Sequence, residues 1–127
     1  MRKKDALAVI DLAETCSIFE QAFNYKATGV CYNNMANFQY KNESYNMAIK
    51  NYDSAILLAE VCLHEKKPEV FFNHLQKDLH GHIESKKCPN LPDISPSARH
   101  YFEVTRAHRV YQRAMCKYKE MRYHGGT

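Results

Sequence analysis

The sequence has few residues that interrupt a helix. Its 127 residues include only four glycines and four prolines, and three of the prolines lie between positions 89 and 96. Long stretches therefore contain no helix breaker, which favours helices over a chain of short strands. No run approaches the roughly 18 to 20 apolar residues that cross a bilayer, so we expect no contact with a membrane.

Catalytic signatures are also missing. The chain has no glycine-rich phosphate loop, no GxSxG or HExxH motif and no pair of carboxylates in an apolar setting. We therefore expect no enzymatic activity, no small-molecule substrate and no cofactor.

Histidines and a cysteine at 74, 80, 82 and 88 are the candidates for a metal site. His80 and His82 are two positions apart and point to different sides of a helix, and no second cysteine lies near Cys88. The spacing therefore predicts no metal site.

The five cysteines, at positions 16, 31, 62, 88 and 116, form no CxxC pair. Reduced, partly buried thiols are the simplest interpretation. The basic start is followed by an apolar stretch that Asp11 and Glu14 interrupt, which makes a poor signal peptide. We expect an intracellular protein, with the cytoplasm as the first expectation and the nucleus as the alternative. The length favours one domain, residues 1–127.

Apolar residues recur at spacings of three and four through most of the chain, which is typical of amphipathic helices. The pattern predicts an all-α protein with five helices at 4–24, 27–41, 45–64, 69–85 and 96–123, and a loop at 86–95. Ser44 is the expected cap of the third helix, and Ser95 with Pro96 starts the fifth.

A trio of small, large and small residues recurs on three of these helices. Alanines flank a larger residue in the order i, i+4, i+7, starting at positions 6, 48 and 107, so 42 and 59 residues apart. These positions share one helix face, and the small residues let a neighbouring helix approach closely. The trios are Ala6-Ile10-Ala13, Ala48-Tyr52-Ala55 and Ala107-Tyr111-Ala114.

Residues 28–60 resemble a tetratricopeptide repeat, in the longer variety of about 42 residues. Tyr32 stands where that family has its Trp, and Met35-Ala36 stand for its Leu-Gly pair. The second helix of the repeat is matched by Tyr45, Ala48, Tyr52 and Ala55. Two positions depart from the family, since Gln39 replaces a usual Tyr and Glu43 replaces the glycine of the turn. The resemblance implies antiparallel helix pairs in a right-handed superhelix, a short solenoid of about five helices.

The resemblance also implies a function. In this family the first helix of each pair lines a groove that holds a partner protein, and the opening helix here resembles a half-repeat with an exposed apolar face. The groove candidates are Asn33, Asn34, Asn37, Tyr40 and Lys41. Amide side chains suit peptide backbones, and Lys41 suits a carboxylate. The alternative is that the Asn residues cap helices or bond between them.

The last helix carries two faces. A seam with alternating spacings of three and four predicts packing on another helix, at Val104, Ala107, Tyr111, Ala114, Tyr118 and Met121. A basic stripe lies beside it, at Arg99, Arg106, Arg109, Arg113 and Lys117. The stripe is either a contact for phosphate or an acidic partner, or a solvated face that balances acidic neighbours such as Asp11, Glu14 and Glu20.

Three functions follow from these features. The first is a non-catalytic protein–protein interaction module, an adaptor or accessory subunit that holds a peptide segment or a larger subunit. The alternative is a basic helical subunit of a nucleic-acid-handling assembly that uses the stripe. The third is a structural spacer without a peptide ligand.

Overall fold

The protein is all-α, as predicted. The computed structural model describes residues 3–22, 24–78 and 93–124, and these residues contain no strand. The helices are α1 (Lys3–Gln21), α2 (Tyr25–Lys41), α3 (Tyr45–Cys62), α4 (Pro68–Asp78) and α5 (Pro96–His124). Both ends of four predicted helices lie within three residues of these bounds. The predicted end of the fourth helix at 85 and most of the loop at 86–95 lie outside the described residues.

Polar side chains and one turn conformation set the helix ends. Asn24 caps α2, because its Oδ1 accepts a hydrogen bond from the Ala27 amide at 3.2 Å. Ser95 caps α5 as predicted, accepting from the Ala98 amide at 3.2 Å. Ser44 precedes α3, but its side chain makes no capping bond. Glu43, in the turn between α2 and α3, has a φ of 62°, the left-handed conformation that glycine adopts readily.

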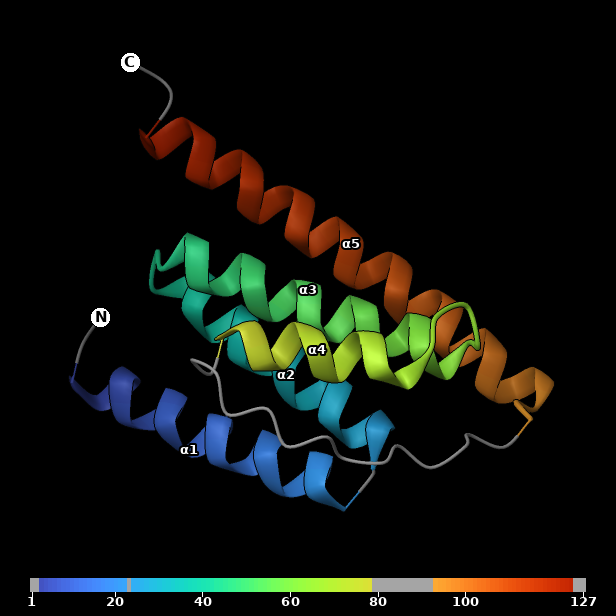
Figure 1. Ribbon diagram of the computed structural model, residues 1–127. Helices are drawn as coiled ribbons and strands as arrows, with labels where there is room; N and C mark the ends of the chain where they lie inside the picture. Colours follow the sequence, from blue (N-terminus) through green and yellow to red (C-terminus); the bar gives the residue numbers. More distant parts are fainter. Residues whose placement is uncertain (1–2, 23, 79–92, 125–127) are drawn as a thin grey trace.

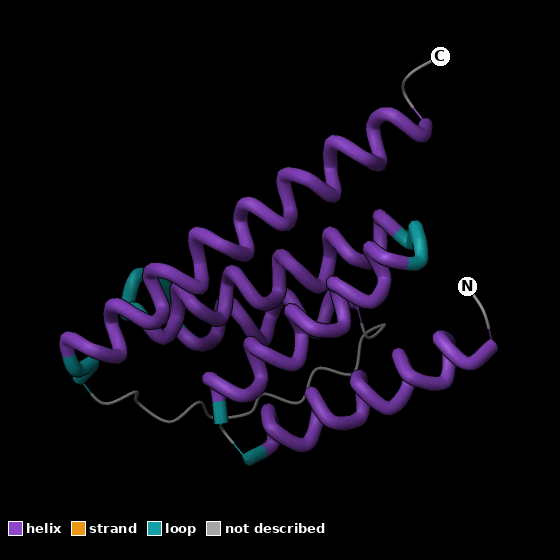
Figure 2. The backbone as a smooth tube through the Cα atoms, turned by 180° about the vertical axis from the view of Figure 1, so that it is seen from behind, coloured by secondary structure: helices purple, strands orange, loops and turns teal. Residues whose placement is uncertain are grey.

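The first three helices pack side by side in chain order (Figure 1). α5 packs along α3 and also contacts α2. α4 lies against α3. α5 runs antiparallel to α3, since Cys116 contacts the start of α3 at Tyr45 and Arg109 contacts its middle at Ala55. Residues 117–124 therefore extend past the start of α3, and both views show this end of α5 standing clear of the other helices (Figures 1 and 2).

The trio on α3 lies in the core, as its spacing predicts. Ala48, Tyr52 and Ala55 are fully buried. The trios on α1 and α5 are not, because Ile10 and Tyr111 each expose about three-fifths of their surface. The prediction that the α5 seam packs on another helix of this chain is therefore wrong for the residues that the structure describes.

Four cysteines are buried, free thiols, namely Cys16, Cys31, Cys62 and Cys116. This confirms the prediction for these four, while Cys88 lies outside the described residues. Burial raises the pKa of Cys62 and of Cys116 to about 11.

The described part of the chain contains no helix that combines the length and the apolar character needed to cross a membrane. Nor do its His, Cys, Asp and Glu side chains come together in a group of three that could hold a metal ion. His80, His82 and Cys88 lie outside the described residues.

Candidate functional site: a groove between α1 and α2

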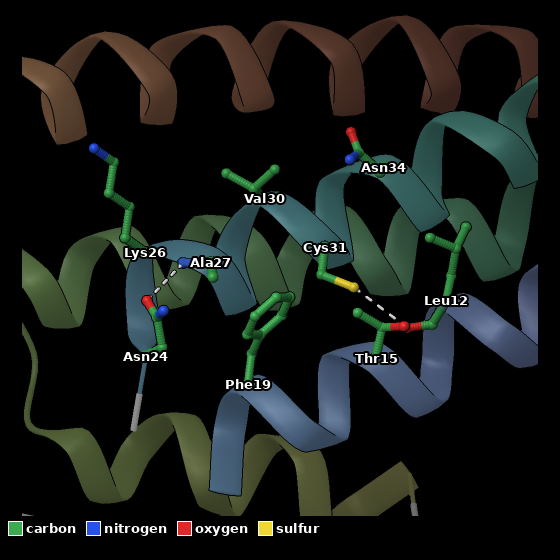
Figure 3. Close-up of a pocket in the computed structure, with 9 residues that line it drawn as sticks. All are labelled: Leu12, Thr15, Phe19, Asn24, Lys26, Ala27, Val30, Cys31 and Asn34. Atoms are coloured by element: carbon green, nitrogen blue, oxygen red, sulfur yellow. Dashed lines mark hydrogen bonds between the residues drawn. The ribbon is translucent and has the colours of Figure 1, made fainter. Parts of the chain in front are cut away.

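A groove of about 470 Å³ lies between α1 and α2 (Figure 3). Its lining comes from the C-terminal half of α1 and the N-terminal half of α2. The lining residues are Leu12, Thr15, Phe19, Asn24, Lys26, Ala27, Val30, Cys31 and Asn34. The groove is within the size range of small-ligand and peptide side-chain pockets.

Cys31 joins the lining of the groove to a closely packed contact between the two helices. Cys16 on α1 and Cys31 and Met35 on α2 make a buried cluster. The Cys31 thiol donates to the backbone carbonyl of Leu12 at 3.3 Å. Burial among these groups raises the pKa of the Cys16 thiol, so this thiol stays protonated and unreactive at neutral pH.

The rim is formed by three α2 residues that follow one another at intervals of one turn. Lys26, Val30 and Asn34 are all exposed, and Phe19 points toward them from α1 (Figure 3). The Lys26 ammonium lies 4.2 Å from the centre of the Tyr101 ring on α5, which holds it beside the groove. The site thus combines apolar walls with two amides, at Asn24 and Asn34, the Thr15 hydroxyl and one cation.

The predicted groove residues do not lie together. Of the five, Asn34 lines this groove, and Lys41 is exposed at the end of α2. Tyr40 packs edge-on against Tyr45, with ring centres 5.7 Å apart, next to a core cluster.

Asn37 joins α2 to two other helices. Its Oδ1 accepts hydrogen bonds from Tyr52 Oη on α3 at 2.6 Å and from Gln112 Nε2 on α5 at 3.0 Å. Asn33 lies one turn earlier on the same side of α2, with a buried Oδ1. Asn37 thus fits the alternative interpretation, in which the Asn residues bond between helices, whereas the buried Asn33 Oδ1 has no hydrogen-bond partner among the described residues.

Three of the five residues of the basic stripe contact α3 or the turn after it. Arg106 pairs with Glu65, and Arg113 pairs with Asp53 at 2.7 Å. Arg99 lies 4.0 Å from Glu103 on its own helix. This pair is exposed and adds little to the stability of the fold. Lys117 is exposed near the free end of α5. The carboxylates that balance the stripe therefore come from α3 and the turn after it.

Arg109 is the buried member of the stripe, with 4% of its surface exposed. Its Nη1 donates to the Ala55 carbonyl at 3.1 Å, and no carboxylate among the described residues pairs with it. Burial lowers the pKa of this guanidinium. Gly29 leaves space for the Arg109 guanidinium, because a Cβ at position 29 would lie only 3.1 Å from Nη1.

Sequence reasoning missed the α1 side of the groove. The spacing of Leu12 and Phe19 indicates that both lie on one apolar face of a helix. This spacing does not distinguish a fully packed contact from one that leaves a groove. Gly29, an isolated glycine inside a helix, could have indicated the close approach of α5, but it does not line the groove.

No protein-family model matches the chain, and no curated protein or solved structure shows significant similarity to it.

Proposed function

We propose that this protein is a non-catalytic protein-binding module, an adaptor or accessory subunit related in design to tetratricopeptide repeats. The observation that carries the proposal is the distribution of exposed apolar side chains over the helices. Of the twelve large apolar side chains that are exposed among the described residues, nine lie on α1 and α5, the first and last helices of the array. Exposed apolar side chains concentrated on the two outermost helices are typical of contacts with other proteins.

The groove between α1 and α2 is the proposed site for a peptide segment. Apolar side chains of the partner would enter between Phe19 and Val30, and the Asn34 amide would bond the peptide backbone. An acidic residue of the partner would lie near Lys26. We therefore expect a short segment with apolar residues and one carboxylate.

The nucleic-acid alternative has less support. Arg106 and Arg113 already pair with carboxylates of this chain, and Arg109 is buried. Of the predicted stripe, Arg99 and Lys117 remain exposed, which is a small basic surface for a phosphate backbone. An intracellular location belongs to the main proposal, and the four buried free thiols support it.

Selection from a library of short random peptides tests the groove. Peptides selected on the wild-type chain should bind the variant Val30→Glu at least about tenfold more weakly, a loss of about 1.4 kcal/mol. The matched control is Val70→Glu on α4, since Val30 and Val70 are 39% and 43% exposed. Peptides that bind both variants equally well would overturn the groove as the binding site.

A further inference from the structure

The exposed face of α5 has the pattern of a helix-pairing seam. Its residues alternate spacings of three and four, as positions a and d of a coiled coil do. Val104, Tyr111, Tyr118 and Met121 expose 53%, 63%, 48% and 61% of their surfaces. Ala107 and Ala114 complete the seam and are also exposed.

The opposite face of α5 holds the helix on the rest of the protein. Phe102, Arg109 and Cys116 follow at seven-residue intervals, and each packs toward α3. A partner on the seam would therefore lie on the far side of α5 from the body of its own chain. Nothing in the described part of the chain covers the seam.

We propose that a second copy of this chain occupies the seam, with the two α5 helices antiparallel. Every a position from 104 to 118 is a large residue, and the d positions at 107 and 114 are alanines. Antiparallel pairing brings a positions opposite d positions, so Tyr111 of one copy meets Ala114 of the other and Ala107 meets Tyr118. Each such layer combines a large and a small side chain, which fills the space without overlap.

Parallel pairing fits the same residues poorly. It would place Tyr111 against Tyr111 and Ala114 against Ala114, which alternates crowded layers with empty ones. It would also bring together like charges. Lys117 and Arg122 flank the seam at positions that meet in a parallel pair, so Lys117 of each copy would lie beside Arg122 of the other. In the antiparallel register, Lys117 faces Val110 and Arg122 faces Tyr101, so no like charges meet.

The free end of α5 supports the same register. Residues 117–124 extend beyond α3 (Figure 2), and antiparallel pairing lays them along residues 101–108 of the second copy. Each copy thereby covers the exposed seam of the other copy. The resulting dimer has twofold symmetry, with the same face used by both chains.

This inference goes beyond peptide binding and uses a different surface, so each can fail separately. Sedimentation equilibrium of the full chain over a range of concentrations should give a monomer–dimer equilibrium. Ala114→Glu should raise the dimer dissociation constant at least about tenfold, because each dimer would bury two carboxylates at its centre. The matched control is Ala13→Glu, an exposed alanine on α1 that should leave the constant unchanged.

Cysteine pairing tests the orientation. In a Cys88→Ser background, an oxidised mixture of Ala107→Cys and Tyr118→Cys chains should give mainly the mixed disulfide between two different chains. Mainly Ala107→Cys homodimers would show a parallel pair and overturn the proposal. A wild-type chain that stays monomeric throughout, or a dimer that Ala114→Glu leaves intact, would also overturn it, whereas Val30→Glu should affect peptide binding alone.

Discussion

The Arg109 guanidinium lies so close to Gly29 that any larger residue at position 29 would crowd it, with a Cβ only 3.1 Å from Nη1. The same nitrogen donates to the Ala55 carbonyl on α3. One buried side chain of α5 thus connects α2 and α3, and the missing side chain at position 29 makes the space for it. This contact accounts for a glycine in the interior of α2, where it would otherwise weaken the helix.

The pair predicts a non-additive effect of two substitutions. Gly29→Val should lower the free energy of unfolding by about 1–3 kcal/mol, because the branched side chain must displace the guanidinium. In an Arg109→Met background the flexible thioether can move aside, so the same substitution should cost at least about 1 kcal/mol less. Urea denaturation of the four chains gives the coupling energy. An equal cost in both backgrounds would show that Arg109 does not set the requirement for glycine.

Asn37 and Asn34 should behave differently although both lie on α2. Asn37→Ala leaves the hydroxyl of the buried Tyr52 and the amide of Gln112 without their acceptor, and should cost about 1–3 kcal/mol. Asn34→Ala, at an exposed position, should change stability by less than about 0.5 kcal/mol. It should instead weaken peptides selected on the groove. If Asn34→Ala changed neither stability nor affinity, the spacer interpretation would gain over the groove.

The alanine trios predict a contrast between α3 and α5. Ala55→Leu should overpack the buried contact and cost about 1–3 kcal/mol. Ala114→Leu occupies the same place in its trio but is exposed. At a concentration low enough to keep the chain monomeric, it should shift the free energy of unfolding by less than about 0.5 kcal/mol. Thermal melts of both variants make the comparison, and equal losses would show that the α5 trio is buried in the isolated chain.

Alkaline pH should destabilise the fold. Burial raises the pKa of Cys62 and Cys116 from 9.0 to about 11, and that of Tyr52 from 10.0 to about 12. The folded chain therefore holds these protons at pH values where the unfolded chain has lost them. The resulting stability is complete below about pH 9 and is lost as the pH rises toward 12.

Melting temperatures measured from neutral pH upward test this effect. Cys62→Ala removes one of the three groups, so its melting temperature should fall less steeply with pH than that of the wild type. Parallel pH profiles for the two chains would mean that the Cys62 thiol does not contribute.

The local parts of the fold could be read from the sequence because local signals determine them. Ser95 with Pro96 marked the start of α5, and the structure has the capping bond at that place. Helical spacing identified the buried trio on α3, although the same spacing on α1 and α5 belongs to exposed positions. The turn predicted at Lys41-Asn-Glu-Ser is present, and Glu43 within it has a positive φ.

The packing of α5 could not be read in this way. The apolar seam was predicted to be the buried face of α5. In the structure the seam is exposed, and the helix contacts α3 with the face that carries Arg109 and Arg113. The reason lies on other elements, because Asp53 and Glu65 supply the charges and Gly29 supplies the space. These residues are 41 to 80 positions away in the chain, so the pattern of α5 itself does not contain the information. The groove was missed for a similar reason, since it depends on how α1 lies on α2.

The most direct test of the protein-binding proposal is to locate a bound peptide by amide NMR. A peptide selected on the wild-type chain is titrated into labelled protein, and the shifted amides are assigned to residues. The account predicts the largest shifts at Phe19, Ala27, Val30 and Asn34, on the two walls of the groove. Shifts confined to α5, or a peptide that moves no amide of α1 or α2, would contradict it.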